Sequence, residues 1–223
     1  MKLTNIILGF IMILSLARCT TSKEGLSYLA LGDSYTIGES VATNSNFPYQ
    51  LADSIGNRGK EYSSPVIIAR TGWRTDQLMD AIESAHLKKE YDLVTLLIGV
   101  NNEFQGRSLE EYERDFTLLC QKSIELAGNK KKRVFVLSIP DYGYTPYGKP
   151  NLNRISTRID MFNASNKRIA DSLQLSYIDI TPVSRQGLND PDLIANDGLH
   201  PSAKMYGLWV KEIMKNMNNK TQD

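Results

Sequence analysis

The chain has 223 residues, of which 41% are hydrophobic, 23% charged and 9% aromatic. This composition is typical of a globular domain and excludes a disordered or collagen-like chain. A domain of this size buries about 70% of the surface that its unfolded chain exposes, so it needs no disulfide or structural metal to fold. The 26 basic and 25 acidic side chains give a net charge of +1. A protein this close to neutral has no excess of positive charge to attract a phosphate backbone. Nucleic acid is therefore not an expected partner.

The N-terminus is typical of a targeting segment. Lys2 precedes an apolar run from Ile6 to Leu14, and the run ends near Leu16. About a dozen apolar residues match the hydrophobic region of a secretory signal and fall short of the roughly 20 that span a bilayer. We therefore expect residues 1–18 to be a signal peptide and the protein to be exported to the periplasm or the cell surface.

Cys19 follows Leu16-Ala17-Arg18, and these four residues resemble a bacterial lipobox. Cleavage before such a cysteine leaves it at the N-terminus, where it carries lipid, and this anchor would be the protein's contact with a membrane. Arg18 departs from the small residue usual at its position. An incidental cysteine beside an ordinary cleavage site is therefore the alternative. We expect residues 19–25 to form a polar tether.

From residue 26 onward, short apolar runs alternate with longer helical patterns. The runs predict strands over Tyr28–Leu31, Val66–Ala69, Leu93–Ile98, Val134–Ile139 and Tyr177–Ile180. Helices are predicted over Thr75–Lys89, Leu109–Ala127, Arg158–Leu173 and Ala203–Met217. This alternation, with continuously apolar strands, predicts an α/β domain with a parallel sheet covered on both faces. We place this one domain at residues 26–218 and a tail at 219–223.

Polar and glycine-containing segments stand at the ends of the predicted strands and near the C-terminus. Ligands bind beyond the carboxyl ends of parallel strands, so these segments are the candidates for a site. They are Gly32-Asp33-Ser34-Tyr35, Arg70-Thr71-Gly72-Trp73, Gly99-Val100-Asn101-Asn102 and Asp197-Gly198-Leu199-His200-Pro201. We expect all four to meet at one edge of the sheet.

Ser34 is the candidate nucleophile, because it stands where a strand should open into a helix. A serine hydroxyl needs a base to take its proton, and the chain has two histidines, His86 and His200. His86 lies among charged residues on a predicted surface helix, which leaves His200 as the base. Asp197, three residues earlier, can accept a hydrogen bond from the imidazole and orient it. For each segment taken alone, the alternative is that its residues only form a turn or cap a helix and have no catalytic role.

Together and in this order, the four segments resemble those of the SGNH, or GDSL-like, hydrolase superfamily, over residues 26 to about 217. The resemblance implies a three-layer, flavodoxin-like fold with strand order 2-1-3-4-5 and the hydrolysis of esters. It implies a catalytic triad of Ser34, His200 and Asp197. It further implies an oxyanion hole formed by the backbone N–H groups of Ser34 and Gly72 and the side-chain amide of Asn101.

Two residues depart from the family's pattern. Tyr35 stands where leucine is common after the serine, and Asn102 stands where aspartate is common after the asparagine. We expect neither side chain to touch a catalytic atom, and we expect their effects to fall on packing and on the orientation of Asn101.

The substrate cleft is predicted to involve the side chains of Asp33, Tyr35, Trp73 and Tyr142. The last of these belongs to a Tyr-, Pro- and Gly-rich loop over residues 140–153, which should form a wall of the cleft. Trp73 has two interpretations, a platform for a sugar or acyl group and a core residue. Trp209, on the last predicted helix, is expected in the core.

Other chemistries lack the residues they need. Gly143 to Lys149 match the first seven positions of a phosphate-binding loop, but Pro150 replaces the Ser or Thr at the eighth. Cys19 and Cys120 lie far apart and form no disulfide framework, and Cys120 is expected to be a buried thiol. With two distant histidines there is no expected metal site, although one built from carboxylates alone stays open. We expect no cofactor.

The sequence therefore predicts an exported serine esterase that acts on small acyl esters, with acetylated carbohydrate as a candidate substrate. A lysophospholipase or thioesterase with the same triad is an alternative. A surface carbohydrate-binding protein with a decayed site is an alternative from another class, although the intact Ser34, Asp197 and His200 argue against decay. Nothing in the sequence indicates an oligomeric state.

Overall fold

The computed structural model describes residues 25–56 and 62–219. The predicted signal peptide over residues 1–18, Cys19 and most of the tether lie outside these residues, as does the tail from residue 220. Across the two described ranges, no helix combines the length and the apolar character needed to cross a bilayer.

Five parallel strands form one sheet in the described part of the chain, in the order β2-β1-β3-β4-β5. The strands are β1 (Tyr28–Asp33), β2 (Val66–Arg70), β3 (Leu93–Leu97), β4 (Val134–Leu137) and β5 (Ser176–Ile178). In the centre of β1, Leu31 pairs with Ile68 of β2 on one side and with Leu96 of β3 on the other. The predicted α/β class and strand order are confirmed.

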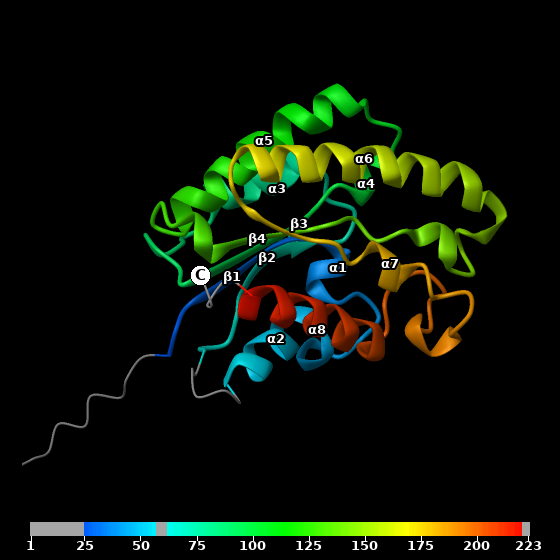
Figure 1. Ribbon diagram of the computed structural model, residues 1–223, viewed down its shortest axis with the longest axis horizontal. Coiled ribbons are helices and arrows are strands. Elements are labelled where there is room, and N and C mark those ends of the chain that lie inside the picture. Colours follow the sequence, from blue (N-terminus) through cyan, green and yellow to red (C-terminus); the bar gives the residue numbers. More distant parts are fainter. Residues whose placement is uncertain (1–24, 57–61, 220–223) are drawn as a thin grey trace, which may run out of the picture.

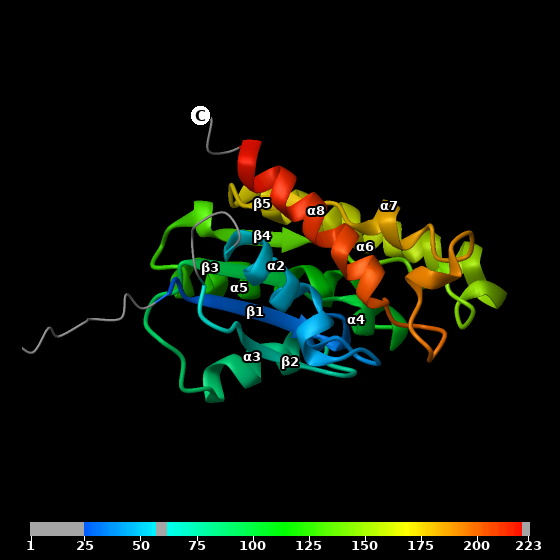
Figure 2. The same cartoon turned by 90° about the horizontal axis from the view of Figure 1, so that it is seen from below.

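Helices cover both faces of the sheet, so the domain has three layers (Figure 1). On one face lie α3 (Thr75–Ser84), α5 (Leu109–Leu126) and α6 (Leu152–Ser172). On the other face, α2 (Phe47–Gly56) packs along α8 (Ala203–Asn219), as Figure 2 shows from below.

Shorter elements lie in the connections. The short helices α1 (Ser34–Ile37) and α4 (Val100–Phe104) follow β1 and β3, and α7 (Thr181–Ser184) follows β5. One-turn 3-10 helices occupy Thr43–Ser45, Lys131–Arg133, Tyr142–Tyr144, Lys149–Asn151 and Pro191–Leu193.

Two helix boundaries differ from the predicted ones by more than two residues, and one longer helix was not predicted. Helix α3 ends at Ser84, five residues before the predicted end, because Ala85 adopts an extended conformation. Helix α6 begins at Leu152, six residues before the predicted start. Helix α2 was not predicted, although its buried residues Phe47, Leu51 and Ile55 recur every four positions, the spacing of one helix face.

The expected burial of all strands on both faces is wrong for β2. This strand lies at the edge of the sheet, and its residues are half-buried or exposed. The expectation holds for β1, β3 and β4, whose residues are all buried. The difference lies in the helices that cover the two edges: β5, the other edge strand, packs against the long helices α6 and α8 and is mostly buried, whereas β2 packs against the four-residue α1 and against α3.

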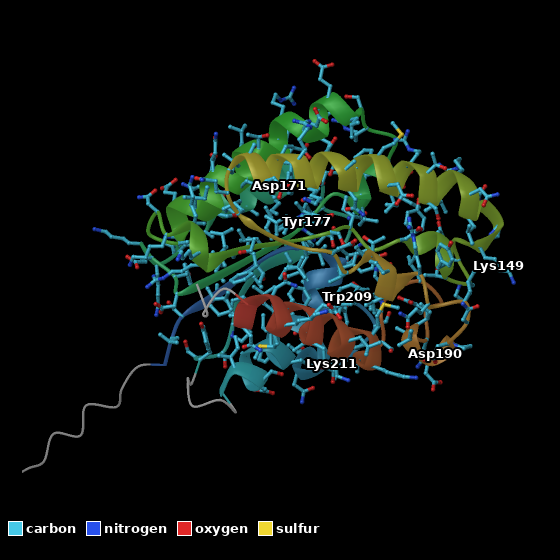
Figure 3. All side chains as sticks on the ribbon, viewed as in Figure 1. Lys149, Asp171, Tyr177, Asp190, Trp209 and Lys211 are labelled. Carbon is cyan, nitrogen blue, oxygen red and sulfur yellow. The ribbon has the colours of Figure 1, made fainter. Side chains whose placement is uncertain are left out.

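An aromatic cluster between α8 and the sheet supports the element that carries Ser34. Trp209 is fully buried, which confirms the predicted core position, and its ring contacts those of Tyr35, Phe47 and Tyr206. Figure 3 shows Trp209 between α8 and the sheet, whereas Lys211 lies on the outer side of the same helix. Because Tyr35 is the second residue of α1, this packing fixes the start of that helix.

Candidate active site

Ser34 stands at the junction of β1 and α1, at the carboxyl edge of the sheet. Asp33 caps the helix, since its Oδ1 atom accepts a hydrogen bond from the backbone N–H of Tyr35 at 3.0 Å. The preceding Gly32 has no room for a side chain, because a Cβ atom there would lie 2.4 Å from the Leu97 carbonyl oxygen. The Gly-Asp-Ser segment therefore forms a tight strand-to-helix turn that begins α1 at Ser34.

His200 is presented by a turn before α8. Gly198 has a φ of +72°, a left-handed conformation that favours glycine. The Oδ1 atom of Asp197 accepts hydrogen bonds of 2.9 Å from the backbone N–H groups of Leu199 and His200. The Asp-Gly turn that was the alternative interpretation is therefore present, and it is the structure that positions the imidazole.

The structure brings Ser34, His200 and Asp197 together. The Nδ1 atom of His200 lies 2.6 Å from Oδ2 of Asp197, and the Nε2 atom lies 3.0 Å from Oγ of Ser34. Ser34 and His200 are 4% and 8% exposed. With the carboxylate holding a proton on Nδ1, Nε2 is free to accept the hydroxyl proton of the serine.

Two carboxyl groups near Ser34 have pKa values shifted in opposite directions. Partial burial raises the pKa of Asp197, but hydrogen bonds from Ser40, His200 and Leu199 outweigh this effect and hold it well below its usual range. Burial raises the pKa of Asp33 from 3.8 to about 7, against a smaller lowering by the N–H of Tyr35. At neutral pH, Asp197 is therefore an anion that can stabilise a protonated His200.

Asn101 and Gly72 lie beside Ser34. The Nδ2 atom of Asn101 donates a hydrogen bond to the carbonyl oxygen of Trp73 at 3.0 Å. An amide nitrogen carries two N–H groups, so the second is available for a substrate oxygen. Gly72 has a φ of +83°, and the side chain of Gln105 donates to its carbonyl oxygen at 3.1 Å. These contacts hold Asn101 and Gly72, two of the three residues of the predicted oxyanion hole, in place.

A cavity of about 260 Å³ opens in front of these residues. Its walls are formed by Ser34, Tyr35, Thr71, Gly72, Val100, Asn101, Phe104, Gln105, Tyr142, Leu199 and His200. Tyr35 and Tyr142 line this cavity as predicted. The other two predicted cleft residues lie elsewhere: Asp33 is buried beneath the helix that it caps, and Trp73 packs half-buried against the core.

Several cavity residues were not predicted. Thr71, Val100 and Leu199 belong to the four quoted segments, so their position in sequence was a usable signal. Phe104 and Gln105 lie one turn of α4 beyond Asn101, at a spacing that places them on the same side of a helix. This signal depends on knowing that α4 is helical.

Tyr142 is fixed by a buried carboxylate that sequence analysis did not find. Its hydroxyl donates to Oε2 of Glu103 at 2.7 Å, and Nε of Arg158 donates to Oε1 at 2.9 Å. The side chain of Glu103 has no exposed surface. Burial and Glu103 raise the pKa of Tyr142. The hydroxyl therefore stays protonated, and the ring is held against the cavity wall.

The two residues that depart from the family's pattern have different environments. The ring of Tyr35 packs beside that of His200, with the ring centroids 5.4 Å apart, so its effect falls on the packing around the imidazole. Asn102 is buried and exchanges hydrogen bonds with Thr75, accepting from its N–H at 3.1 Å and donating to its hydroxyl at 2.8 Å. Asn102 thus joins α4 to the start of α3.

The remaining candidates lie away from the cavity. His86 is exposed in the loop after α3, and Cys120 is fully buried, with a thiol pKa raised by that burial. In the segment that matches part of a phosphate-binding loop, Gly148 packs so closely that a Cβ atom would lie 1.9 Å from the Tyr142 carbonyl oxygen. Within residues 25–56 and 62–219, no three His, Cys, Asp or Glu side chains are placed to hold a metal ion.

The sequence model of the GDSL-like Lipase/Acylhydrolase family matches residues 30–208, which include all four segments. The chain belongs to this family. As a GDSL-like family member it is a carboxylic ester hydrolase, and its substrates are small-molecule esters. No curated protein sequence matches the chain.

Solved structures of other proteins have the same fold. TesA has a TM-score of 0.69 at 15% identity, over 86% of this chain and 98% of TesA. Axe2, an acetylxylan esterase from Geobacillus stearothermophilus, has a TM-score of 0.68 at 18% identity, over 87% and 94% of the two chains. The psychrotrophic esterase EstA from Pseudoalteromonas sp. has a TM-score of 0.63 at 18% identity, over 88% and 99%.

Proposed function

We propose that this GDSL-like hydrolase is a serine esterase in which Ser34, His200 and Asp197 form the catalytic triad. The observation that carries the proposal is a continuous pair of short contacts at the cavity wall. One contact joins Asp197 Oδ2 to His200 Nδ1, and the other joins His200 Nε2 to Ser34 Oγ. This is the arrangement that activates a serine hydroxyl as a nucleophile.

Acylation begins when Oγ of Ser34 attacks the carbonyl carbon of the ester and Nε2 of His200 takes the hydroxyl proton. The ionised Asp197 stabilises the imidazolium that forms. The negative carbonyl oxygen accepts hydrogen bonds from the backbone N–H groups of Ser34 and Gly72 and from the amide of Asn101. The bond to the alcohol then breaks, His200 gives its proton to the leaving alcohol, and the acyl group stays on Ser34.

Deacylation repeats these steps with water as the nucleophile. His200 takes a proton from the water, and the hydroxide attacks the acyl carbon. When the intermediate collapses, the bond to Oγ breaks and His200 returns the proton to Ser34. The products are the carboxylic acid and the free enzyme.

We propose esters of small acyl groups as the substrates. The cavity of about 260 Å³ is slightly smaller than the roughly 300 Å³ at which typical ligand pockets begin. The structural similarity to Axe2, which is an acetylxylan esterase, supports acetylated carbohydrate as a candidate.

A second candidate is an ester or thioester with a longer acyl chain, such as a lysophospholipid. The observation that favours it is the exposed aromatic surface beside the cavity. Phe104 and Tyr147 are 55% and 54% exposed, and their ring centroids lie 6.4 Å apart. An acyl chain too long for the cavity could continue over these two rings, because apolar contact of this kind is favourable in water.

A fluorophosphonate probe and a panel of substrates test the proposal. The probe should label Ser34, and Ser34→Ala and His200→Ala should each abolish turnover while leaving the melting temperature nearly unchanged. Ser45→Ala, which removes a half-buried hydroxyl of the same connection that contacts Asn44, is the matched control. Turnover near that of the wild type in Ser34→Ala would refute the triad. Comparing p-nitrophenyl esters of increasing length with acetylated xylo-oligosaccharides separates the two substrate classes.

We also propose that the protein is exported and held at a membrane by lipid on Cys19. The support comes from sequence alone: an apolar run of signal-peptide length that ends close to a cysteine. Export would place the esterase in the periplasm or on the cell surface, where polymeric esters and lipids are accessible.

A further inference from the structure

Asp197 has a fourth hydrogen-bond donor, which comes from the segment after Ser34. The hydroxyl of Ser40 donates to Oδ2 of Asp197 at 2.6 Å, across 157 positions of sequence. The same oxygen faces Nδ1 of His200, while Oδ1 accepts from the backbone N–H groups of Leu199 and His200. Ser40 and the imidazole therefore share one oxygen of the carboxylate.

Ser40 has a backbone conformation that is unfavourable for serine. Its φ is +66°, in the left-handed region, where a Cβ atom crowds the neighbouring backbone. Among the described residues, the other non-glycine positions with positive φ are Asn129 and Gln174. Glycine would adopt this conformation without strain, so a role for the side chain explains why serine occupies it.

The turn that carries Ser40 is attached to the nucleophile's own residue. The carbonyl oxygen of Ser34 accepts hydrogen bonds from the backbone N–H groups of Gly38 and Glu39, at 3.1 and 3.0 Å. On the same turn, the carboxylate of Glu39 accepts from the hydroxyl of Thr71, next to the glycine of the predicted oxyanion hole. One turn thus contacts Asp197 through Ser40 and the segment of Gly72 through Glu39.

We propose that Ser40 is a positioning residue for ester hydrolysis, whose hydroxyl holds the Asp197 carboxylate in the orientation that pairs it with His200. The inference rests on the proposed triad. The side chain of Asp197 is 29% exposed, so without Ser40 water can compete for Oδ2 and the carboxylate can rotate. Because Asp197 acts most strongly when His200 is protonated, the contribution of Ser40 belongs to the transition state.

Three variants separate the hydroxyl from the shape of the turn. Ser40→Ala removes the hydroxyl and keeps the Cβ atom, Ser40→Gly also relieves the backbone, and Ser45→Ala is a control in the same connection. We expect both Ser40 variants to lower kcat about tenfold, the effect of losing a hydrogen bond to a charged group, with KM changed less than twofold. Ser40→Gly should be at least as stable as the wild type. The control Ser45→Ala should have the kcat and KM of the wild type.

A double-mutant cycle with Asp197→Asn tests whether Ser40 acts through Asp197. In the Asp197→Asn background, Ser40→Ala should change kcat less than twofold, because the group that it orients is already impaired. A wild-type kcat in Ser40→Gly would show that the hydroxyl is not needed and that only the conformation of the turn matters. An equal loss of kcat on Ser40→Ala in the wild-type and Asp197→Asn backgrounds would show that Ser40 does not act through Asp197. Either result overturns the inference while the triad stands, whereas activity in Ser34→Ala removes the triad itself.

Discussion

Asn101 and Asn102 are adjacent in α4, but their side chains have different surroundings. The amide of Asn101 lines the cavity and donates to the Trp73 carbonyl oxygen, whereas that of Asn102 is buried against Thr75. Successive side chains of a helix point about 100° apart, so neighbours in sequence can serve different purposes. Substitutions at the two positions should therefore affect different properties of the enzyme.

Asn101→Ala should lower kcat by about 10² to 10³ with little change in KM. A donor aimed at the oxygen that becomes negative binds the transition state more strongly than the substrate, and losing one such donor costs about 3 kcal/mol. Turnover should be measured per active site, after titration with a fluorophosphonate. A normal value per site would remove Asn101 from the mechanism even if Ser34 is required.

Asn102→Ala should instead lower the free energy of unfolding. The substitution leaves the N–H and hydroxyl of Thr75 without their partner in a buried position, at a cost of about 1–3 kcal/mol. Urea unfolding measures this loss, and kcat per titrated site should stay within a few-fold of the wild type. A stable variant with a large loss of kcat would mean that Asn102 acts on the chemistry through Asn101.

Asp33→Asn should stabilise the protein increasingly as the pH rises from 4 to 7. Burial raises the pKa of Asp33 to about 7 in the folded state, against 3.8 as the reference for the unfolded chain. Between these pH values the unfolded chain has released its proton while the folded state still holds it, so the wild type loses about 1.4 kcal/mol of stability per pH unit, and the loss is complete above pH 7. Asparagine can cap α1 without this cost.

The increase in the free energy of unfolding that Asp33→Asn produces should be about 2 to 4 kcal/mol larger at pH 8 than at pH 4. Chemical unfolding of both proteins across this range measures it, with the exposed Asp53→Asn as the control. Stability curves that run parallel for wild type and Asp33→Asn would show that Asp33 is ionised at the same pH in both states.

Tyr142→Ala should shift the preference of the enzyme toward longer acyl groups. The ring forms part of the cavity wall, so its removal makes space for additional methylene groups, each worth about 0.8 kcal/mol when buried. We expect the ratio of kcat/KM for p-nitrophenyl hexanoate over acetate to rise about tenfold.

Tyr142→Phe is the matched control for this change. It keeps the ring in the wall and should keep the preference, while losing the hydrogen bond to Glu103 should cost about 1–3 kcal/mol of stability. An unchanged preference in Tyr142→Ala would show that the acyl group binds away from this wall.

Cys19→Ser should release the protein from membranes or stall its processing. If Cys19 carries lipid, the wild-type protein will partition with membranes in a bacterial host, since an acyl anchor adds buried apolar surface. Fractionation and mass spectrometry of the mature N-terminus check this. An unmodified N-terminus beyond Cys19 would contradict lipidation and leave export as a separate question.

The sequence by itself determined the fold class and, through the family resemblance, the strand order, and it predicted Ser34, His200 and Asp197 as a triad. These features have local signals, because a buried parallel strand is continuously apolar and Gly-Asp-Ser or Asp-Gly segments must turn. Asp33 illustrates this local control, since its side chain caps α1 by accepting a hydrogen bond from the N–H of Tyr35, two residues later. The roles of Ser34, Asp197 and His200 in turnover stay predictions of the sequence.

Only the tertiary structure decided which side chains surround these residues. Ser40 meets Asp197 across 157 positions, and Glu103 meets Tyr142 across 39, so no local pattern in the sequence could reveal either pair. The structure also decided between the two interpretations of Trp73, since this residue packs half-buried against the core. Contacts between distant segments depend on how whole helices and strands pack, which short-range residue patterns do not encode.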